Sequence, residues 1–510
     1  MARTSKTPLC LAATCSLALS ACALSPPYHA PSAPAVQRYT AAAPLARTAA
    51  APGAGGMAQG FAYGQAAPAQ WWQLYDSAEL DRLVARAFRQ SPTLAAAAAK
   101  LRQAQAITRA NEGIFYPQVN GNLSATRQQN STASYSGRGP GNIFSVYNGN
   151  ISVSYYPDFF GVNRLIYQGS LAQEDFQRYE LQAARLTLAG NVVSAYLGAA
   201  AAEAQIAATR AIVQGQQDLL NLVRAQYQAG AAPYLNVVNQ EAQLASAQAT
   251  LPPLEQSLSV YRHQLALLAG EFPADFALRP DELDKLKLPA RIPVSLPAEL
   301  VRQRPDIRAA EAQLRYANAQ VGVAVAQMYP TLNLTGSFGQ NSLSVSKFLD
   351  STSNIWSLAA NLAAPIFRGG TLEAQKQAAK AAYDATLAQY QQTVLGAFQQ
   401  VADALRALEH DAQTLRAQAR ALRAAQQALD LAQTSYRAGA LDYLSLLTAQ
   451  VQYQTARIGY VKSQAQRYQD TSALFLALGG DWREPAAAHA AGAQASPARH
   501  GPRALTQEAK

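Results

Sequence analysis

The feature that most constrains the fold of this 510-residue sequence is an internal repeat. Residues 91–270 and 304–480 carry the same motifs in the same order. Each half predicts a helix, a short strand, a loop, a second strand and then very long helices, an order that fits neither a sandwich nor an alternating parallel sheet. The repeat therefore indicates a symmetric tube built from two copies of one unit. The matching motifs, 213, 213 and 209 residues apart, are Ser91-Pro92 and Arg304-Pro305, Tyr116-Pro117 and Tyr329-Pro330, and Tyr227-Gln-Ala-Gly230 and Tyr436-Arg-Ala-Gly439.

Two segments in each half alternate between apolar and other residues, as a strand with two different faces does. The intervening positions are mostly Asn, Ser and Thr and carry no charge. This composition favours the wall of a water-filled channel over the alternative, a half-buried sheet in a soluble protein. Each predicted strand has about 9–11 residues, which suffices to cross a bilayer when tilted. The apolar positions are Val119, Gly121, Leu123 and Ala125; Ile151, Val153 and Tyr155; Leu332, Leu334, Gly336 and Phe338; and Trp356, Leu358, Ala360 and Leu362.

Four strands from one chain cannot close a barrel, and lipid excludes open sheet edges. Several subunits must therefore pool their strands, and three copies of the chain would give a twelve-stranded barrel. The polar connections at about 127–149 and 340–354 are predicted to be loops that face the outside of the cell.

A segment with proline and glycine follows each second strand and precedes about 65 residues without a helix breaker. A helix of that length spans roughly 100 Å, well beyond the diameter of a small domain. In the second copy, apolar residues recur at alternating spacings of four and three, which is the seam of a coiled coil. The first copy keeps a looser version of this stripe. The seam of the second copy is Val394, Phe398, Val401, Leu405, Leu408, Ala412, Leu415, Ala419 and Leu422.

Each long helix is predicted to end at a matched turn and to be followed by a helix that returns toward the strands. Gly230 and Gly439 suit the left-handed conformation that stops a helix. Pro233 and Asp442 suit the start of the next one. The two hairpin tips are therefore expected to lie far from the barrel and to reach across the periplasm.

The N-terminal sequence predicts an exported lipoprotein. A basic start and a short apolar stretch precede Leu19-Ser20-Ala21-Cys22, which is typical of a bacterial lipobox. Cleavage before Cys22 would remove a signal peptide of residues 1–21 and leave an acylated cysteine as the first residue. Two or more hydrocarbon chains give lasting membrane attachment, and Ala23 at the next position fits sorting to the outer membrane. The processed chain would keep a single cysteine, so no disulfide framework is expected.

Composition divides the rest of the chain. Residues 22–70 are rich in Pro, Ala and Gly and predict a lipidated flexible leash. A first repeat over 71–270 and a second over 304–484 are joined by a proline-rich crossover, 271–303. Residues 485–510 predict a disordered tail. No run of about 18 apolar residues follows the signal, so no transmembrane helix is expected.

Charge and motif content exclude several function classes. The formal charge of +10 falls to +8 without the signal, and the Lys and Arg residues are scattered rather than clustered, which argues against nucleic-acid binding. The five histidines lack ligand spacing, and the sequence has no nucleophile elbow, paired-cysteine motif or nucleotide loop. We therefore expect no enzymatic activity, and no cofactor or metal apart from a covalent lipid on Cys22.

The chain resembles the TolC superfamily, specifically its NodT-type outer-membrane efflux lipoproteins, over nearly all of residues 71–482. This resemblance implies a homotrimer in which a twelve-stranded outer-membrane barrel continues into a tunnel of coiled helices in the periplasm. It also implies two partners, a periplasmic adaptor (membrane fusion) protein and an inner-membrane pump. The motifs that carry the resemblance are Leu296-Pro-x-x-Leu300, Arg304-Pro-Asp-Ile307, Ala310-Glu311, Trp71-Trp72, Tyr329-Pro330, Pro365-Ile-Phe367 with Gly369-Gly370, and Tyr436-x-x-Gly439 leading to Leu444.

The resemblance also suggests where the periplasmic end closes. In the family, a leucine ring and an acidic ring just beyond the second tip narrow the passage. Leu444 occupies the leucine position, whereas Thr448 stands at the acidic position, with Asn239 at the corresponding place in the first half. This departure predicts a gate without anionic character. Asp442 is the one carboxylate near the tip and also suits a helix N-cap. The expected adaptor-contact positions are Gly230, Pro233, Gly439 and Asp442.

These observations predict the outer-membrane exit duct of a tripartite efflux system, lipid-anchored and extending into the periplasm, that passively conducts small molecules. An outlet for type I secretion of polypeptide shares the same architecture and remains an alternative. A non-channel periplasmic scaffold lipoprotein is a third possibility, but it would not need four strands with uncharged polar faces.

Overall fold

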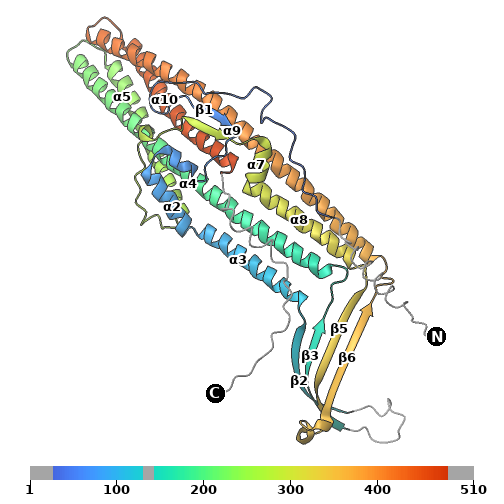
Figure 1. Cartoon of the computed structure of the whole chain (residues 1–510). Coiled ribbons are helices and arrows are strands. Elements are labelled where there is room, and N and C mark those ends of the chain that lie inside the picture. The colour runs from blue at the N-terminus through green and yellow to red at the C-terminus, as the bar shows by residue number, and fades with distance from the viewer. Residues whose placement is uncertain (1–26, 130–142, 481–510) are drawn as a thin grey trace, which may run out of the picture. The chain divides into compact units, whose positions relative to one another are not determined.

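The computed structural model describes residues 27–129 and 143–480 and divides into two compact units (Figure 1). The repeats predicted over 71–270 and 304–484 follow the order of the chain, whereas each unit takes segments from both halves. Unit 1 comprises Thr93–Leu181, Asp306–Leu395 and the described residues up to Ser32, and unit 2 comprises Ala33–Pro92, Gln182–Pro305 and the described residues from Gly396 onward.

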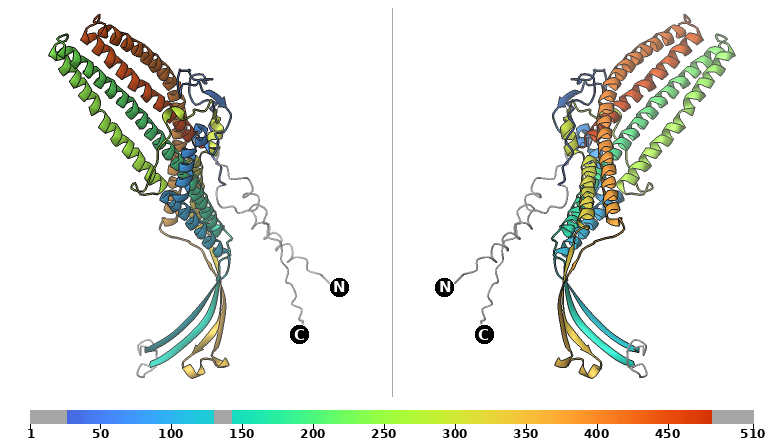
Figure 2. Two further views of the ribbon diagram at one scale, coloured as in Figure 1. Left: turned by 90° about the vertical axis from the view of Figure 1, so that its left-hand side faces the viewer. Right: turned by 90° about the vertical axis from the view of Figure 1, so that its right-hand side faces the viewer.

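Unit 1 contains a sheet of four antiparallel strands in the order β2-β3-β5-β6. Figure 2 shows that β2 and β3 bend away from β5 and β6 toward the connecting loops, so the sheet is curved. Consecutive strands are neighbours, as short connections favour, and β3 joins β5 across the middle of the sheet, so the sheet unites the two halves of the repeat. The strands are β2 (Gln118–Gln129), β3 (Ile143–Tyr155), β5 (Thr331–Ser342) and β6 (Asn354–Ala363).

The strands extend beyond their predicted ends, so the expectation of loops over all of 127–149 and 340–354 was wrong. Arg127 pairs with Ser145, and Gln340 pairs with Asn354. The ladder is made by backbone groups, and it continues where the side-chain alternation that revealed the strands has already ended.

The helices of unit 1 pack through small and aliphatic side chains. Leu165 of α4 lies in one buried cluster with Val323 and Ala326 of α8. The two longest helices, α4 and α9, have 67 residues each, so the prediction of about 65 residues is confirmed. The helical elements here are α3 (Pro92–Glu112), α8 (Pro305–Ala326), the first parts of α4 (Val162–Gln228) and α9 (Thr371–Arg437), and the 3-10 turns η2 (Gly113–Phe115), η4 (Val345–Lys347) and η5 (Ser351–Ser353).

Unit 2 holds the remainder of α4 and α9 and the helices that follow them. Along α9 the predicted seam is buried at Val401, Leu408 and Leu415, with no exposure at the surface. The other elements are α2 (Ala78–Gln90), α5 (Tyr234–Ala249), α6 (Leu251–Ala269), α7 (Pro297–Gln303), α10 (Tyr443–Leu478), β1 (Gly60–Tyr63), β4 (Arg291–Val294), η1 (Trp71–Tyr75) and η3 (Leu283–Lys285).

The two returning segments differ, although the sequence predicts one helix for each. In the second copy α10 is continuous, whereas in the first copy the helix breaks at Thr250 into α5 and α6. Pro252 and Pro253 have no amide hydrogen to donate to the preceding turn, which explains the break.

The segment predicted as a flexible leash, 22–70, is packed over much of its described length. Strand β1 pairs in parallel with β4, and Thr48 and Gln59 are buried. The segment lacks periodicity because its contacts are made by scattered backbone and polar groups. One of their partners is Arg467 of α10, whose Nη2 donates to Thr48 Oγ1 (3.0 Å) and to the carbonyl of Met57 (2.7 Å).

Candidate functional site

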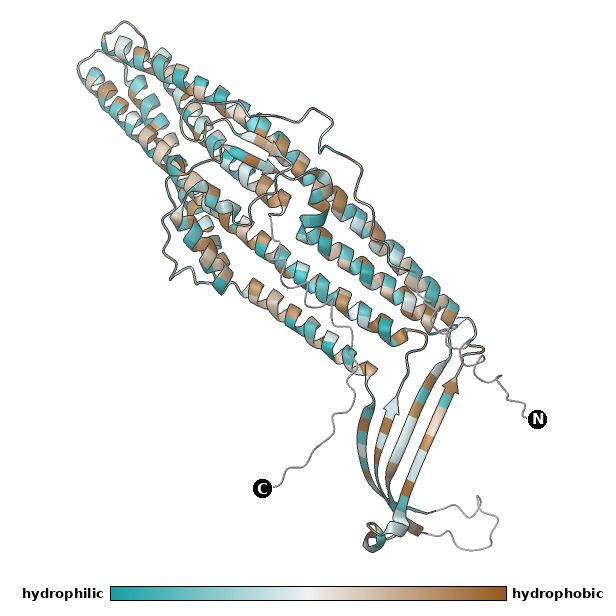
Figure 3. Cartoon of the chain, in the orientation of Figure 1, coloured by the Kyte–Doolittle hydropathy of each residue, from teal (hydrophilic) through white to brown (hydrophobic). Residues whose placement is uncertain are grey.

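The sheet of unit 1 has two chemically different faces, and its register aligns them across all four strands. One row consists of Gly121, Ile151, Phe338 and Trp356. The next row, on the opposite face, consists of Asn120, Ser152, Ser337 and Ser357. Figure 3 shows the same alternation as changes of hydropathy along the strands. The two-period pattern in the sequence therefore becomes one apolar and one polar surface.

The polar face carries hydroxyl and amide groups. The hydroxyls of Ser337 and Ser357 are hydrogen-bonded across β5 and β6 at 2.8 Å. In the four strands of this sheet no position of the polar face holds an ionisable residue, and Arg127, their one charged residue, lies on the other face near the end of β2. Apart from Phe144, Val146 and Ile355, which lie on this face near the connecting loops, the surface can contact water.

Along β6, no other part of the described chain covers the apolar face. The side chains of Trp356 and Leu358 are 78% and 81% exposed. Contiguous apolar area of this kind is unfavourable in water, and it marks an interface with lipid or protein. Together with the strand lengths, it fits the hydrocarbon-facing side of a membrane barrel.

Both edges of the sheet are open. Strand β2 pairs only with β3, and β6 pairs only with β5. Every residue of β2 and of β6 is exposed. Each edge therefore presents unpaired backbone donors and acceptors, which lipid does not tolerate.

The two hairpin tips of unit 2 share one backbone design. Gly230 and Gly439 both have φ of +73°, the left-handed conformation that the sequence predicts. The amide of Ala231 donates to the carbonyl of Gln226 at 2.8 Å, and the amide of Ala440 donates to the carbonyl of Ser435 at 2.9 Å. Each bond joins an amide to the carbonyl five residues earlier in the sequence. The C-termini of α4 and α9 are therefore capped in the same way.

The starts of the returning helices differ. Pro233 is the N-cap of α5 and makes no side-chain capping bond, whereas Asp442 Oδ1 accepts a hydrogen bond from the amide of Ser445 at 2.8 Å at the start of α10. The hydrogen bonds from Ser445 hold the pKa of Asp442 below its ordinary value of 3.8. Asp442 is therefore an N-cap, as its position suggested.

This cap predicts a pH dependence at the second tip. A carboxylate whose pKa is lowered on folding stabilises the folded form above its unfolded pKa, and this contribution is lost as the pH falls through the lower, folded value. We expect the protection factor of the Ser445 amide against hydrogen exchange to be constant between about pH 5 and 8 and to fall below about pH 4. Asp442→Asn should keep the cap and lose the pH dependence, whereas Asp442→Ala should fray the first turn at every pH. An unchanged pH profile in Asp442→Asn would contradict this assignment.

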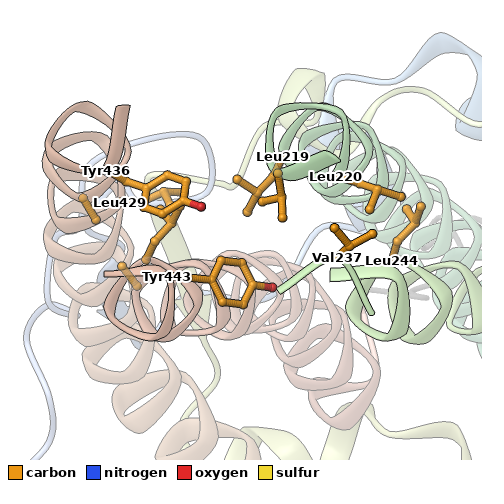
Figure 4. Packing of buried hydrophobic residues seen from close by; sticks show 11 residues of the cluster. Leu219, Leu220, Val237, Leu244, Leu429, Tyr436 and Tyr443 are labelled. Atoms are coloured by element: carbon orange, nitrogen blue, oxygen red, sulfur yellow. The ribbon is translucent and has the colours of Figure 1, made fainter. Parts of the chain in front are cut away.

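The two hairpins pack against each other near their tips through a hydrophobic cluster that contains two tyrosines (Figure 4). The hydroxyl of Tyr436 donates to Gln226 Oε1 at 2.6 Å, and that of Tyr443 donates to Gln240 Oε1 at 3.0 Å. Gln240 Nε2 in turn donates to the carbonyl of Gln216 at 3.0 Å. The cluster consists of Leu219, Leu220, Val223, Val237, Leu244, Leu429, Ala432, Tyr436, Tyr443, Leu446 and Ala449.

The sequence did not identify Gln216 and Gln240, which are fully buried. A glutamine within an otherwise aliphatic helical stripe was the only available signal for them. The corresponding tyrosines of the first copy, Tyr227 and Tyr234, are exposed and pack against each other with ring centroids 5.3 Å apart. The two tips therefore share a backbone but present different surfaces.

The predicted gate residues lie on exposed helix surfaces. Leu444 and Thr448 are one turn apart on the same exposed face of α10, and Thr448 Oγ1 donates to the carbonyl of Leu444 at 2.9 Å. Asn239 is exposed on α5, in the other hairpin. The structure thus brings two of the three residues together. Cys22, the predicted lipidation site, lies outside the described residues.

The outer-membrane character of this chain follows from comparison with known proteins. A family model described as outer membrane efflux protein matches residues 83–271 and 296–480, which correspond to the two halves of the repeat. The chain belongs to the outer membrane efflux protein family.

Relatives in this family match the chain over most of its length. It is similar to the pyoverdine export outer membrane protein OpmQ of Pseudomonas putida, with 33% identity over 85% of this chain and 93% of OpmQ. It is also similar to the outer membrane protein OprJ of Pseudomonas aeruginosa, with 32% identity over 92% of this chain and 95% of OprJ. Its fold matches that of the outer-membrane channel OprN with a TM-score of 0.81 and 27% identity, over 90% of this chain and 99% of OprN.

The family settles the principal predictions. The TolC-like fold, the location in the outer membrane with an extension into the periplasm, and the role as an efflux exit duct are confirmed. The relatives are channel proteins rather than enzymes. Among the described residues, no helix combines the length and hydropathy that crossing a membrane requires.

Proposed function

We propose that three copies of this efflux protein assemble into one conduit whose wall in the membrane is a twelve-stranded barrel. The observation that carries this proposal is the two-faced sheet with two open edges. Pairing β6 of one copy with β2 of the next satisfies both edges, and a heterologous contact of this kind closes into a ring. The ring places the apolar face toward lipid and the polar face toward a water-filled passage.

Cysteine cross-linking across the proposed seam tests the assembly. Ser357→Cys in β6 and Asn120→Cys or Asn122→Cys in β2 lie on the polar face at opposite edges. Each β2 variant combined with Ser357→Cys should give disulfide-linked dimers and trimers on a non-reducing gel. Ser152→Cys with Ser337→Cys is the matched control, because these residues are directly paired within one chain and should give an internal disulfide. Monomers alone from every seam pair would reject a closed ring.

We further propose that the hairpin tips bind a periplasmic adaptor, through which an inner-membrane pump delivers the cargo. The exposed Tyr227 and Tyr234 at the first tip support this, since aromatic side chains are enriched at protein interfaces. Leu444, Thr448 and Asn239 are the proposed constriction at the periplasmic end. Gly230, Pro233, Gly439 and Asp442 shape the adaptor-facing turns, and Cys22 carries the lipid anchor.

The cargo is proposed to be small molecules rather than polypeptide. Deletion of the gene should sensitise cells to several unrelated antibiotics, detergents, dyes or metal ions, and the intact gene should restore resistance. An unchanged panel together with loss of a secreted polypeptide would favour the type I secretion outlet.

The lipid anchor is tested in the same deletion strain, which is complemented with the Cys22→Ser variant. This substitution should abolish incorporation of an alkyne-labelled palmitate into the protein.

A further inference from the structure

The connection between β5 and β6, residues 343–353, is an ordered segment that folds back onto the apolar face of the sheet. It contains η4 and η5 and lies at the strand ends far from the helices of unit 1 (Figure 1). Ser342 Oγ donates to the carbonyl of Ser344 at 2.9 Å, and Ser353 Oγ donates to the carbonyl of Lys347 at 2.7 Å. We call residues 343–353 the external loop.

The loop is anchored on a glycine. Gly149 of β3 lies in the apolar-face row between Leu123 and Gln340. A Cβ atom on Gly149 would lie 2.8 Å from Phe348 Cζ and 3.2 Å from Leu123 Cδ1, so the phenyl ring occupies the space that a side chain would fill. Phe348 is therefore a positioning residue, because it holds the loop against the sheet.

The loop carries exposed apolar side chains. Leu343, Val345 and Leu349 are 67%, 66% and 83% exposed. Burying an aliphatic side chain of this size is favourable, so exposing three of them to water destabilises the loop in water. Between the loop and β2 lies a cavity of about 390 Å³, whose lining includes Leu123, Ala125 and Tyr147 of the apolar face.

The apolar run of β5 and β6 is short for a bilayer. It extends from Leu332 to Phe338 in β5 and from Trp356 to Leu362 in β6. Six residue steps at about 3.3 Å correspond to about 15 Å of membrane thickness once the strands are tilted, against an apolar band of about 25 Å in outer-membrane barrels. The amides of Gln340 and Asn354, hydrogen-bonded at 2.6 Å, occupy the next position of this face.

We propose that the external loop is a second lipid-contacting surface, in which acyl chains of the outer leaflet cover Leu343, Val345 and Leu349. The surface continues the apolar face of the sheet past the point where β5 and β6 become polar, and it compensates for their short apolar run. The inference rests on the proposed function, since it requires that the apolar face contacts lipid.

Depth-dependent fluorescence quenching tests the proposal on the assembled protein in vesicles of brominated phosphatidylcholine. An environment-sensitive fluorophore is attached to Leu343→Cys or Leu349→Cys, and the unsubstituted protein sets the labelling background. We expect both labels to lose most of their emission when bromine lies near the headgroup. Leu358→Cys should be quenched by bromine deep in the bilayer, and Ser337→Cys, on the polar face, should respond only to aqueous iodide.

The outcomes separate the inference from the proposed function. If iodide quenches the labels at positions 343 and 349 while brominated lipid quenches the label at position 358, the inference about the loop is overturned. The proposed barrel is then still supported. Labels at 343 and 349 that respond to neither quencher mean that a neighbouring subunit covers the loop, which also overturns it. A 358 label that does not respond to lipid rejects the barrel itself.

The anchoring role of Phe348 is tested in the same system. Phe348→Ala should release the loop and make the 349 label accessible to iodide, while the 358 label stays quenched by lipid. Lys347→Ala, one residue away, should leave both signals unchanged. Lipid quenching at 349 that survives Phe348→Ala would show that Phe348 does not position the loop.

Discussion

Leu358→Arg is expected to abolish assembly in the outer membrane, whereas Ser357→Arg, one residue away, is expected to be tolerated. Leu358 lies in the middle of the apolar run of β6 and is 81% exposed. An arginine on the lipid side of a barrel costs about 2–4 kcal/mol near the bilayer midplane, and a homotrimer would incur this cost three times. Ser357 lies on the polar face, where a guanidinium stays in water. The measurement is the yield of trimer in isolated outer membranes.

The tolerated variant supplies a second observation. Ser357→Arg adds a fixed positive charge to a polar face that has no ionisable residue in the described strands. The reversal potential across a planar bilayer should therefore shift toward anion selectivity, as a ring of Arg residues favours anions. Loss of Ser357→Arg instead would show that the faces have been assigned the wrong way round, and equal yields would show that neither face is selectively exposed to lipid.

Arg467→Ala is expected to destabilise unit 2 by about 3–5 kcal/mol, the range for truncating a large buried side chain and leaving its acceptors unpaired. Arg467 is fully buried, and its Nη2 holds Thr48 and the carbonyl of Met57, which lie more than 400 residues away in the sequence. Loss of these bonds should also release the N-terminal segment. The checks are the thermal midpoint and the hydrogen-exchange protection of the Thr48 amide, which donates to the carbonyl of Gln59 at 2.9 Å.

A graded series separates packing from hydrogen bonding at Arg467. Burial lowers the pKa of this guanidinium, and its Nε and Nη1 have no hydrogen-bond partner among the described residues. Arg467→Met fills the space and removes the cost of a partly satisfied buried charge, so it should be less harmful than Arg467→Ala. Arg423→Ala, on an exposed position of α9, should change the midpoint little. Equal effects of the Ala and Met variants would assign the stability to hydrogen bonds alone.

Periodic features could be predicted from the sequence, and features that depend on single contacts could not. The alternation along β2, β3, β5 and β6, the length of α4 and α9 and the glycine turns at 230 and 439 all repeat or carry strong local preferences. By contrast, β1 and β4 are four residues each, too short for a pattern. The packing of the predicted leash includes contacts with β4 and with Arg467, which lie far along the chain, and no local signal indicates those contacts.

The functional sites divide in the same way. The two-faced sheet could be predicted from the composition of the strands and their two-residue alternation. Membership of the family then confirmed the location in the outer membrane. Two other features depend on tertiary neighbours, so no local sequence pattern could reveal them. They are the buried amides of Gln216 and Gln240 and the packing of Phe348 against Gly149. The gate assignment to Leu444 and Thr448 came from resemblance, and it stays a prediction.

The different surroundings of the two tyrosine pairs have an evolutionary consequence. Tyr436 and Tyr443 are buried in the core of the tips, whereas Tyr227 and Tyr234, their counterparts in the first copy, are exposed. Substitution of the buried pair is penalised through folding, but the exposed pair can change at little cost to stability. Duplication thus leaves one hairpin to preserve the architecture and the other free to change its surface while the scaffold stays the same.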